Sequence, residues 1–364
     1  MRDSLPSSRQ GWALSLRAAG PNRATLRRAA ETLLIAAAGG IAFQSAGVPA
    51  GLISGSILAV AGAALCGRNL GVPIGLARLV MITVGIALGS VVTPQMLHGI
   101  ASYPASIAVL CASTFAIMGA NWFYFRAVHR WDGLTALFGA SPGALAQVTA
   151  LSTESAADLG AVLIVQTVRV VVLTVALPSG LALFGLAASV ARRVGAGGGS
   201  LWEILLLIAV SAAAAVALSR FRFPGAWMFG AMLGSAGLHG FGVVTHGLPW
   251  WVSSAAMMSL GAVNGARFAH ITLGQLASYL GAALGSLCVA LVVATLSVVL
   301  AAHLVAVPPA DIVLAYSPGA QDTMMVLALA LNLDPVFVGA HHLTRFLLVS
   351  LAIPVMARVH RPRP

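Results

Sequence analysis

Apolar residues along this chain fall into long runs, separated by short segments that carry most of the arginines. Most runs approach the roughly 20 residues that an α-helix needs to cross about 30 Å of hydrocarbon. Because lipid offers the backbone no hydrogen-bond partners, such runs are expected to be helical. The pattern therefore predicts an all-α, polytopic membrane protein. The runs lie near residues 31–48, 50–66, 74–92, 101–126, 133–152 and 157–188, and then near 201–219, 224–240, 250–266, 275–306, 310–332 and 335–357.

Composition sharpens this prediction. Hydrophobic residues make up 59% of the 364 positions and charged residues only 8%, whereas about a quarter of a soluble domain is usually charged. A water-facing surface cannot be built from so few charges. The net charge of +11 comes from arginines near the chain ends and between the apolar runs, where the positive-inside rule places them. We therefore expect a multi-pass protein of the bacterial inner membrane, surrounded by the lipid bilayer and without a nucleic-acid partner.

The chain repeats itself at an offset of 176 residues. Residues 140–178 and 316–354 align without a gap, and both contain Ser-Pro-Gly followed by an aspartate, an arginine and a proline. Such agreement in one register is not expected by chance, so we predict two homologous repeats of five to six transmembrane helices each. The matched pairs are Ser141 and Ser317, Pro142 and Pro318, Gly143 and Gly319, Asp158 and Asp334, Arg169 and Arg345, and Pro178 and Pro354.

The duplication sets the expected domain boundaries. Residues 1–30 form an arginine-rich N-terminus, which we place in the cytoplasm. The first membrane repeat covers residues 31–188 and the second covers residues 201–357. Between them lies a Gly-rich linker, residues 189–200, whose composition is typical of flexible connections. Residues 358–364 form a short C-terminal tail.

The fifth apolar run of each repeat carries Ser-Pro-Gly in its interior. Proline removes a helix hydrogen-bond donor and glycine favours a break, so each of these runs is expected to be discontinuous or re-entrant. If the run crosses the membrane, each repeat has six spans and the repeats are parallel. If it returns to its starting side, each repeat has five crossings and the repeats are inverted. The loop arginines do not decide between the two topologies, although broken helices in inverted repeats are a recurrent transporter plan.

The same segments carry a resemblance to a known family. The stretches LTALFGASPGALAQ at residues 134–147 and DIVLAYSPGAQDTMM at residues 311–325 resemble the AbrB family of bacterial membrane proteins. The resemblance covers nearly the whole chain after residue 30 and implies a duplicated membrane domain. This chain departs from the family pattern at the second glycine after the proline, where it has Ala144 and Ala320. Some relatives are labelled as ammonia monooxygenases and others as regulators of gene expression, so the resemblance implies no single activity.

Arg169 and Arg345 each lie about eleven residues into the sixth run of a repeat, near the middle of the membrane by helix rise. A charge there costs at least roughly 2.5–3.5 kcal/mol on insertion scales, so the fold must compensate it. Each arginine can bind carbonyls that the break leaves free, or pair with an acid. Alternatively, both arginines and the half-helix N-termini can hold an anion. The second interpretation predicts a substrate site formed by Ser141, Pro142, Gly143, Arg169, Ser317, Pro318, Gly319 and Arg345.

Two further side chains are candidates for coupling transport to protons. Asp322 follows the second Ser-Pro-Gly, and an acid beside a broken membrane helix is typical of proton or cation coupling. Its structural alternative is an ion pair with Arg345. His342 lies three residues before Arg345 and can shuttle protons, or it can be a buried histidine bonded to its neighbours. The adjacent His341 shares a helical face with Arg345.

Other repeated residues are expected to be structural. Gly85-x-x-x-Gly89 and Gly261-x-x-x-Gly265 are spaced so that two helices can approach closely. An aspartate opens the sixth run of each repeat, where it would cap the helix N-terminus.

The sequence thus favours a transporter-like protein that moves a small molecule or ion, with an anion as a candidate, across the inner membrane. One alternative is a membrane component that affects the regulation of gene expression. The other is a membrane enzyme of the ammonia monooxygenase type, which would need several converging histidines as copper ligands, and no spacing in the sequence unites the histidines. We expect no cofactor and no metal site, and we leave enzymatic activity, the solute and a homo-oligomer open.

Overall fold

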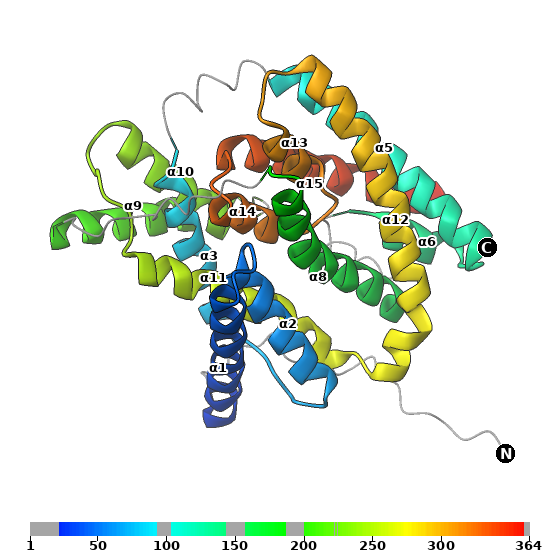
Figure 1. Ribbon diagram of the computed structural model, residues 1–364, viewed down its shortest axis with the longest axis horizontal. Helices are drawn as coiled ribbons and strands as arrows, with labels where there is room; N and C mark the ends of the chain where they lie inside the picture. Colours follow the sequence, from blue (N-terminus) through cyan, green and yellow to red (C-terminus); the bar gives the residue numbers. More distant parts are fainter. Residues whose placement is uncertain are drawn as a thin grey trace.

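The computed structural model describes residues 22–92, 103–142, 157–186, 200–221, 223 and 225–359. In these parts of the chain the backbone forms 13 α-helices and one 3₁₀-helix, with no strand (Figure 1). The all-α fold predicted from the sequence is therefore confirmed. Most of the arginine-rich N-terminus and most of the predicted linker lie outside the described residues, so the domain boundaries stay predictions.

The helices of the first half follow the order of those in the second. The first half contains α1 (Arg23–Ser45), α2 (Gly51–Leu65), α3 (Ile74–Gly89), α5 (Tyr103–Val128), α6 (Gly133–Ala140) and α8 (Leu159–Leu183). The second contains α9 (Leu201–Arg220), α10 (Ala226–Gly240), α11 (Trp250–Gly265), η4 (Ala266–His270), α12 (Leu273–Leu304), α13 (Pro309–Tyr316), α14 (Gln321–Ala330) and α15 (Pro335–Val359).

Five of the described helices are long and apolar enough to cross a membrane, namely α5, α8, α9, α12 and α15. The apolar helices α2 and α3 have 15 and 16 residues, which corresponds to about 23 Å and is shorter than a typical hydrocarbon core. Helices α9 and α12 expose large side chains such as Leu205 and Leu296, as a lipid-facing surface requires. The chain is a helical membrane protein, while its ten to twelve crossings stay a prediction.

The fifth run of the second half is broken, as expected. Helix α13 ends at Tyr316, and α14 begins at Gln321 after the Ser-Pro-Gly segment. With eight and ten residues, the two helices are about 12 and 15 Å long, so neither crosses the membrane alone. The backbone N–H of Asp334, just before α15, donates to the carboxylate of Asp311 in the first turn of α13, at 2.6 Å. The segment therefore returns to the end at which it started.

The first half makes the same contact at the same offset. The backbone N–H of Asp158, the N-cap of α8, donates to the hydroxyl oxygen of Thr135 in the first turn of α6, at 2.8 Å. Helix α6 ends before Ser141, and residues 143–156 lie outside the described part. The two described ends of each fifth run thus lie close together, which favours five crossings per half over six.

The glycine pairs make the close contacts between helices predicted for them. A Cβ atom on Gly85 or Gly89 of α3 would collide with the backbone of α10. A Cβ atom on Gly261 or Gly265 of α11 would meet backbone and side-chain atoms of α2. Each pair therefore packs a helix of one half against a helix of the other.

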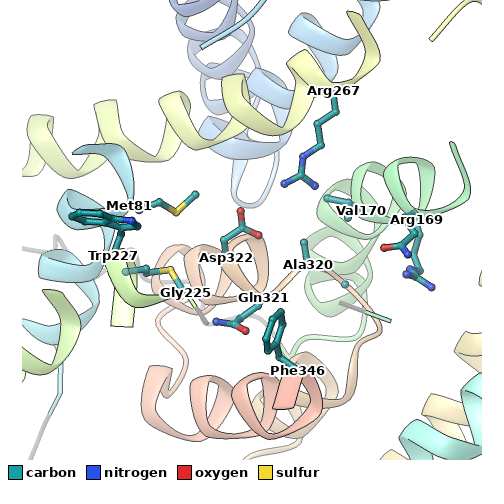
Figure 2. A pocket seen from close by; sticks show the side chains of 13 residues that line it. Met81, Arg169, Val170, Gly225, Trp227, Arg267, Ala320, Gln321, Asp322 and Phe346 are labelled. Atoms are coloured by element: carbon teal, nitrogen blue, oxygen red, sulfur yellow. The ribbon is translucent and has the colours of Figure 1, made fainter. Parts of the chain in front are cut away.

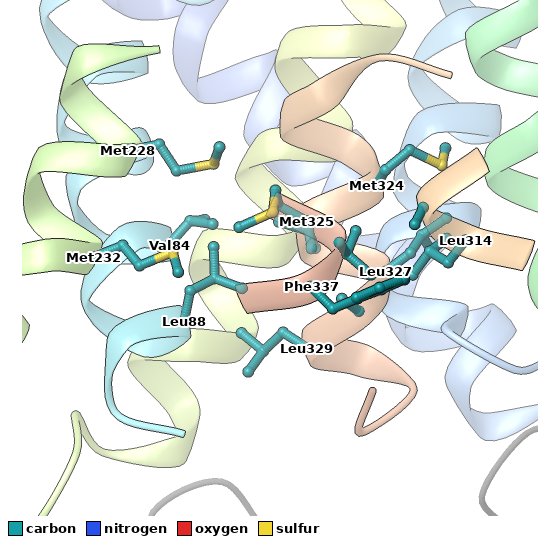
Figure 3. Close-up of a cluster of buried hydrophobic side chains, with 14 of the residues drawn as sticks. Val84, Leu88, Met228, Met232, Leu314, Met324, Met325, Leu327, Leu329 and Phe337 are labelled. Carbon is teal, nitrogen blue, oxygen red and sulfur yellow. The ribbon is translucent and has the colours of Figure 1, made fainter. Parts of the chain in front are cut away.

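Helix α14 lies in the centre of the molecule, between α3, α8 and α15 (Figure 1). Its side chains Met324, Met325 and Leu327 are fully buried. Figure 3 shows them packed with Val84 of α3, Met228 of α10 and other apolar side chains of both halves. This packing surrounds α14 and fixes where its N-terminus, just after Ser-Pro-Gly, lies in the fold.

Candidate functional site

A cavity of about 280 Å³ opens at the N-terminus of α14 (Figure 2). Helices of both halves contribute to its wall, together with the segment between α13 and α14. The lining residues are Met81, Gln166, Arg169, Val170, Gly225, Trp227, Met228, Arg267, Gly319, Ala320, Gln321, Asp322 and Phe346.

The break between α13 and α14 is held by Arg345. Proline and glycine interrupt the helix and leave carbonyl groups at the end of α13 without helical donors. The Arg345 guanidinium donates to the carbonyl oxygens of Ser317, at 2.5 Å, and Ala315, at 3.1 Å. Arg345 is only 2% exposed and does not line the cavity. The interpretation that this arginine binds freed carbonyls is therefore confirmed, and its expected alternative partner, Asp322, makes no ion pair with it.

Arg169 makes the equivalent contact in the first half and also reaches the cavity. Its guanidinium donates to the carbonyl oxygen of Ser141 at 3.2 Å, so it binds the carbonyl end of α6. The side chain is 3% exposed, and its Nε atom has no hydrogen-bond partner in the described part of the chain. The unused Nε atom is itself enclosed by protein, so it is the position of this buried charge beside the cavity that favours an anionic group there.

The predicted site residues are therefore only partly brought together. Arg169, Gly319 and Asp322 line the cavity. The side chains of Ser141 and Ser317 are buried and donate to carbonyls of their own helices. Pro142 and Pro318 are buried beside them and do not line it, and Gly143 lies outside the described residues.

His342 is placed away from the cavity. One of its ring nitrogens, Nε2, lies 3.1 Å from the carbonyl oxygen of Leu314. At the same offset in the first half, the side-chain amide of Gln166 donates to the carbonyl oxygen of Phe138, also at 3.1 Å. A glutamine can make this hydrogen bond but cannot shuttle a proton. Since both halves keep the bond, we interpret the contact of His342 as a structural one.

His341 is also buried and fully engaged. Its Nδ1 lies 2.8 Å from the carbonyl oxygen of Phe337 and its Nε2 lies 2.7 Å from the hydroxyl of Ser106. Because a carbonyl can only accept, Nδ1 carries the proton and Nε2 accepts from the serine when the ring is neutral. In the described part of the chain, no group of three or more His, Cys, Asp and Glu side chains is arranged to hold a metal ion.

Arg267 and Asp322 face the same cavity from opposite sides. Figure 2 shows the Arg267 side chain extending from η4 toward the carboxylate of Asp322 at the start of α14. The two charged groups form no ion pair within 4.0 Å. One Asp322 oxygen accepts the backbone N–H of Thr323 at 3.0 Å. The cavity therefore offers the Arg267 guanidinium and the Asp322 carboxylate to a bound molecule, while Arg169 lines it with its guanidinium pointing away from these two groups in Figure 2.

Sequence reasoning missed several of the lining residues. Arg267 stands where the first half has Val91, so the repeat that drew attention to Arg169 could not indicate it. Its position directly after the second glycine pair was the available signal. Trp227 and Met81 come from helices that the sequence predicted only as membrane spans, and their approach to α14 depends on packing between the halves.

The chain is similar in sequence to proteins of one known family. The model of the AbrB family, described as “Transition state regulatory protein AbrB”, matches residues 52–361. The “Uncharacterized protein YhjN” of Bacillus subtilis is 26% identical over 298 residues, which cover 76% of each chain. The “Putative regulator AbrB” of Escherichia coli is 26% identical over 330 residues, covering 87% of this chain and 92% of that protein. With the family model matching most of its length, the chain belongs to the AbrB family.

Proposed function

We propose that this protein is a transporter that moves a small anionic solute across the bacterial inner membrane through the cavity at α14. The observation that carries the proposal is a cavity between helices of both halves whose lining includes two arginines, the half-buried Arg267 and the buried Arg169. In a low-dielectric setting, an unneutralised guanidinium attracts an anion strongly.

The fold supports transport because the cavity lies between two similar halves. The contacts of Arg169 with Ser141 and of Arg345 with Ser317 recur at an offset of 176 residues, and so do the contacts between the two ends of each fifth run. We propose that the chain is duplicated and that its halves are inverted, with five crossings each. Broken helices around a central site in inverted repeats are typical of secondary transporters, in which one half moves against the other.

Asp322 is the preferred coupling residue in this proposal. Its carboxylate shares the cavity with Arg267, so in its ionised form it competes with the solute for the guanidinium. Protonation removes this competition and favours anion binding, which would couple a proton to the solute. His342 is less suited, because it does not line the cavity and its Nε2 lies against the carbonyl oxygen of Leu314.

The name of the Escherichia coli relative points to regulation. Our proposal accommodates such an effect through transport, since import or export of a metabolite changes the signal that a separate regulator reads. A direct effect would need a surface that contacts a soluble partner. The sequence offers the arginine-rich residues 1–30 for this purpose, most of which lie outside the described residues. Deleting residues 1–21 separates these two routes, because only a direct effect would disappear while solute binding stays intact.

A binding screen tests the proposal. The thermal midpoint of detergent-purified protein is measured with acetate, 4-methylpentanoate, succinate, phosphate and ammonium, for wild type, Arg267→Gln, Arg169→Gln and Arg126→Gln. Arg126 is an exposed arginine near the end of α5 and serves as the matched control. We expect at least one anion to raise the midpoint of the wild type and of Arg126→Gln, and this shift to vanish in Arg267→Gln and Arg169→Gln.

The same variants are then reconstituted in liposomes, and uptake of the stabilising anion is followed at two external pH values. Arg267→Gln is the decisive variant, because Arg267 has no hydrogen bond or ion pair in the described part of the chain and its loss should leave the fold intact. If no anion shifts the wild-type midpoint, or if Arg267→Gln and Arg169→Gln both keep the shift, the proposed function is wrong.

A further inference from the structure

The cavity has an apolar end as well as a cationic one. Met81 of α3 and Trp227 of α10 lie at the end opposite Arg169 (Figure 2), and Phe346 of α15 lines it from below in that view. Met228 adds a second methionine from α10. Met81 and Trp227 thus form an apolar end, and the Asp322 carboxylate lies between that end and Arg267 in Figure 2. A cavity with an apolar end and a cationic group is expected to bind a ligand with one apolar and one anionic end.

The apolar wall is held in place from outside the cavity. The Arg78 guanidinium lies 5.1 Å from the centroid of the Trp227 ring, a distance at which a cation is attracted by an indole. Met228 is 2% exposed, so its backbone and most of its side chain are fixed by packing. Methionine side chains adapt to ligands of irregular shape, whereas the indole offers a rigid flat surface.

An inorganic anion fits this cavity poorly. Phosphate or sulfate would have to lose bound water at the apolar end, where Met81, Trp227 and Phe346 offer no replacement for the lost hydrogen bonds. A hydrocarbon group in the same place releases water from both surfaces, and this gain grows with the area buried. The cavity of about 280 Å³ corresponds to about nine water molecules at roughly 30 Å³ each, which leaves room for several carbon atoms beside an anionic group.

We propose that the solute is an organic carboxylate with a branched or aromatic apolar body. Arg267 binds the carboxylate, the buried charge of Arg169 favours it from the cavity wall, and Met81, Trp227, Met228 and Phe346 contact the apolar body. This inference rests on the proposed function, because it assumes that the cavity binds the transported anion. It goes further in naming the chemical class of that anion and in assigning Trp227 as a specificity-determining residue.

The experiment compares matched probes on the full-length protein in detergent. Isothermal titration measures the affinity for 4-methylpentanoate, phenylacetate, acetate, phosphate and the neutral amide 4-methylpentanamide. Each probe is titrated into wild type, Trp227→Ala and Trp202→Ala. Trp202 lies on α9, is 71% exposed and does not line the cavity, so it controls for the loss of a tryptophan.

We expect 4-methylpentanoate or phenylacetate to bind at least about tenfold more tightly than acetate, since each well-packed methylene contributes about tenfold or more. Phosphate and the amide should bind more weakly still, because one lacks the apolar body and the other the charge. Trp227→Ala should abolish the preference over acetate, while Trp202→Ala should retain it. Circular dichroism and the thermal midpoint verify that both variants are folded.

The outcomes separate the two proposals. If phosphate or acetate binds as tightly as the larger carboxylates, or if Trp227→Ala keeps the preference, the inference about the solute is wrong while the anion transporter stands. If the amide binds as tightly as 4-methylpentanoate, the negative charge is not recognised and both proposals fail. If none of the probes binds and no other anion stabilises the protein, both proposals likewise fail.

Discussion

The backbone N–H of Asp334 donates a hydrogen bond of 2.6 Å to the carboxylate of Asp311, 23 residues earlier in the chain. Between these two residues the chain passes through α13, the Ser-Pro-Gly break and α14. The contact therefore joins the entrance and the exit of a helical hairpin. Thr135 and Asp158 make the same connection in the first half. A hairpin of this kind would add no crossing, so the contact predicts five crossings per half and opposite orientations for the two halves.

The first prediction is that both ends of this hairpin are reached from one side of the membrane. In a background without native cysteines, we expect Ala306→Cys and Leu333→Cys to react with an impermeant maleimide added to the same side of oriented vesicles. Gly274→Cys, at the other end of the 32-residue helix α12, should react only from the opposite side. A Cβ atom at Gly274 meets no other atom within 4 Å, so this control should not disturb the fold.

Labelling of Ala306→Cys and Leu333→Cys from opposite sides would show instead that the fifth run crosses the membrane. The repeats would then be parallel, with six spans each. A cysteine in place of Ala24, near the start of α1, identifies the cytoplasmic side if the N-terminus lies there.

Much of this architecture could be predicted from the sequence, because backbone groups in lipid must make their hydrogen bonds within the protein. The apolar runs had to be helices, and Pro318 with Gly319 had to interrupt one of them. The direction of the chain after the break could not be predicted, because it depends on a contact between Asp311 and Asp334 that has no separate sequence signal.

The candidate site was predictable only where the two halves share a residue. Arg169 was found because Arg345 repeats it, yet the two arginines differ in their surroundings, since only Arg169 lines the cavity. Arg267 and Trp227 come to the cavity through packing between helices of different halves. One sequence does not reveal such packing, because any apolar helix face can serve as the contact.

The second prediction concerns the role of Arg345 at the break. Arg345→Met should lower the free energy of unfolding by about 1–3 kcal/mol, because the carbonyls of Ser317 and Ala315 lose their donor in a buried place. Arg267→Met also removes a guanidinium, but this one is half-buried and makes no hydrogen bond or ion pair with the described residues. This substitution should therefore change the free energy of unfolding by less than about 0.5 kcal/mol. Urea titration in mild detergent micelles measures both values. Equal effects of the two substitutions would contradict a capping role for Arg345.

The third prediction is a pH dependence that originates at Asp334. Burial raises the pKa of this carboxyl above its ordinary value, although its bonds with the backbone N–H groups of Phe337 and Val336 act in the other direction. A raised folded-state pKa means that the contribution to stability is complete below the unfolded pKa of about 3.9 and is lost as the pH rises through the folded value. Stability should therefore fall from about pH 4 upward.

Asp334→Asn tests this dependence, because asparagine keeps an oxygen for the helix N-cap but does not ionise. The backbone N–H that donates to Asp311 is unchanged in the variant. We expect the stability of Asp334→Asn relative to wild type to increase between pH 4 and pH 7, as measured by thermal midpoints at constant ionic strength. A difference that stays constant over this range would show that Asp334 does not titrate there.

The fourth prediction concerns the contact between the halves at Gly265. A Cβ atom on this residue of α11 would lie 2.8 Å from the carbonyl oxygen of Ile57 and 2.8 Å from the Cβ atom of Val60, both of α2. Because the carbonyl oxygen belongs to the helix backbone and a Cβ atom is fixed directly to it, neither neighbour can move aside alone. Gly265→Ala should therefore separate the helices and lower stability by about 1–3 kcal/mol. Gly119→Ala on α5 is the matched control, since a Cβ atom there meets nothing within 4 Å and alanine favours helix over glycine by about 1 kcal/mol. The two substitutions should therefore change the unfolding midpoint in opposite directions. If Gly265→Ala were as stable as Gly119→Ala, α2 and α11 would have to lie further apart than the structure places them. The two halves would then pack less closely beside the cavity at α14 than the proposed transporter needs.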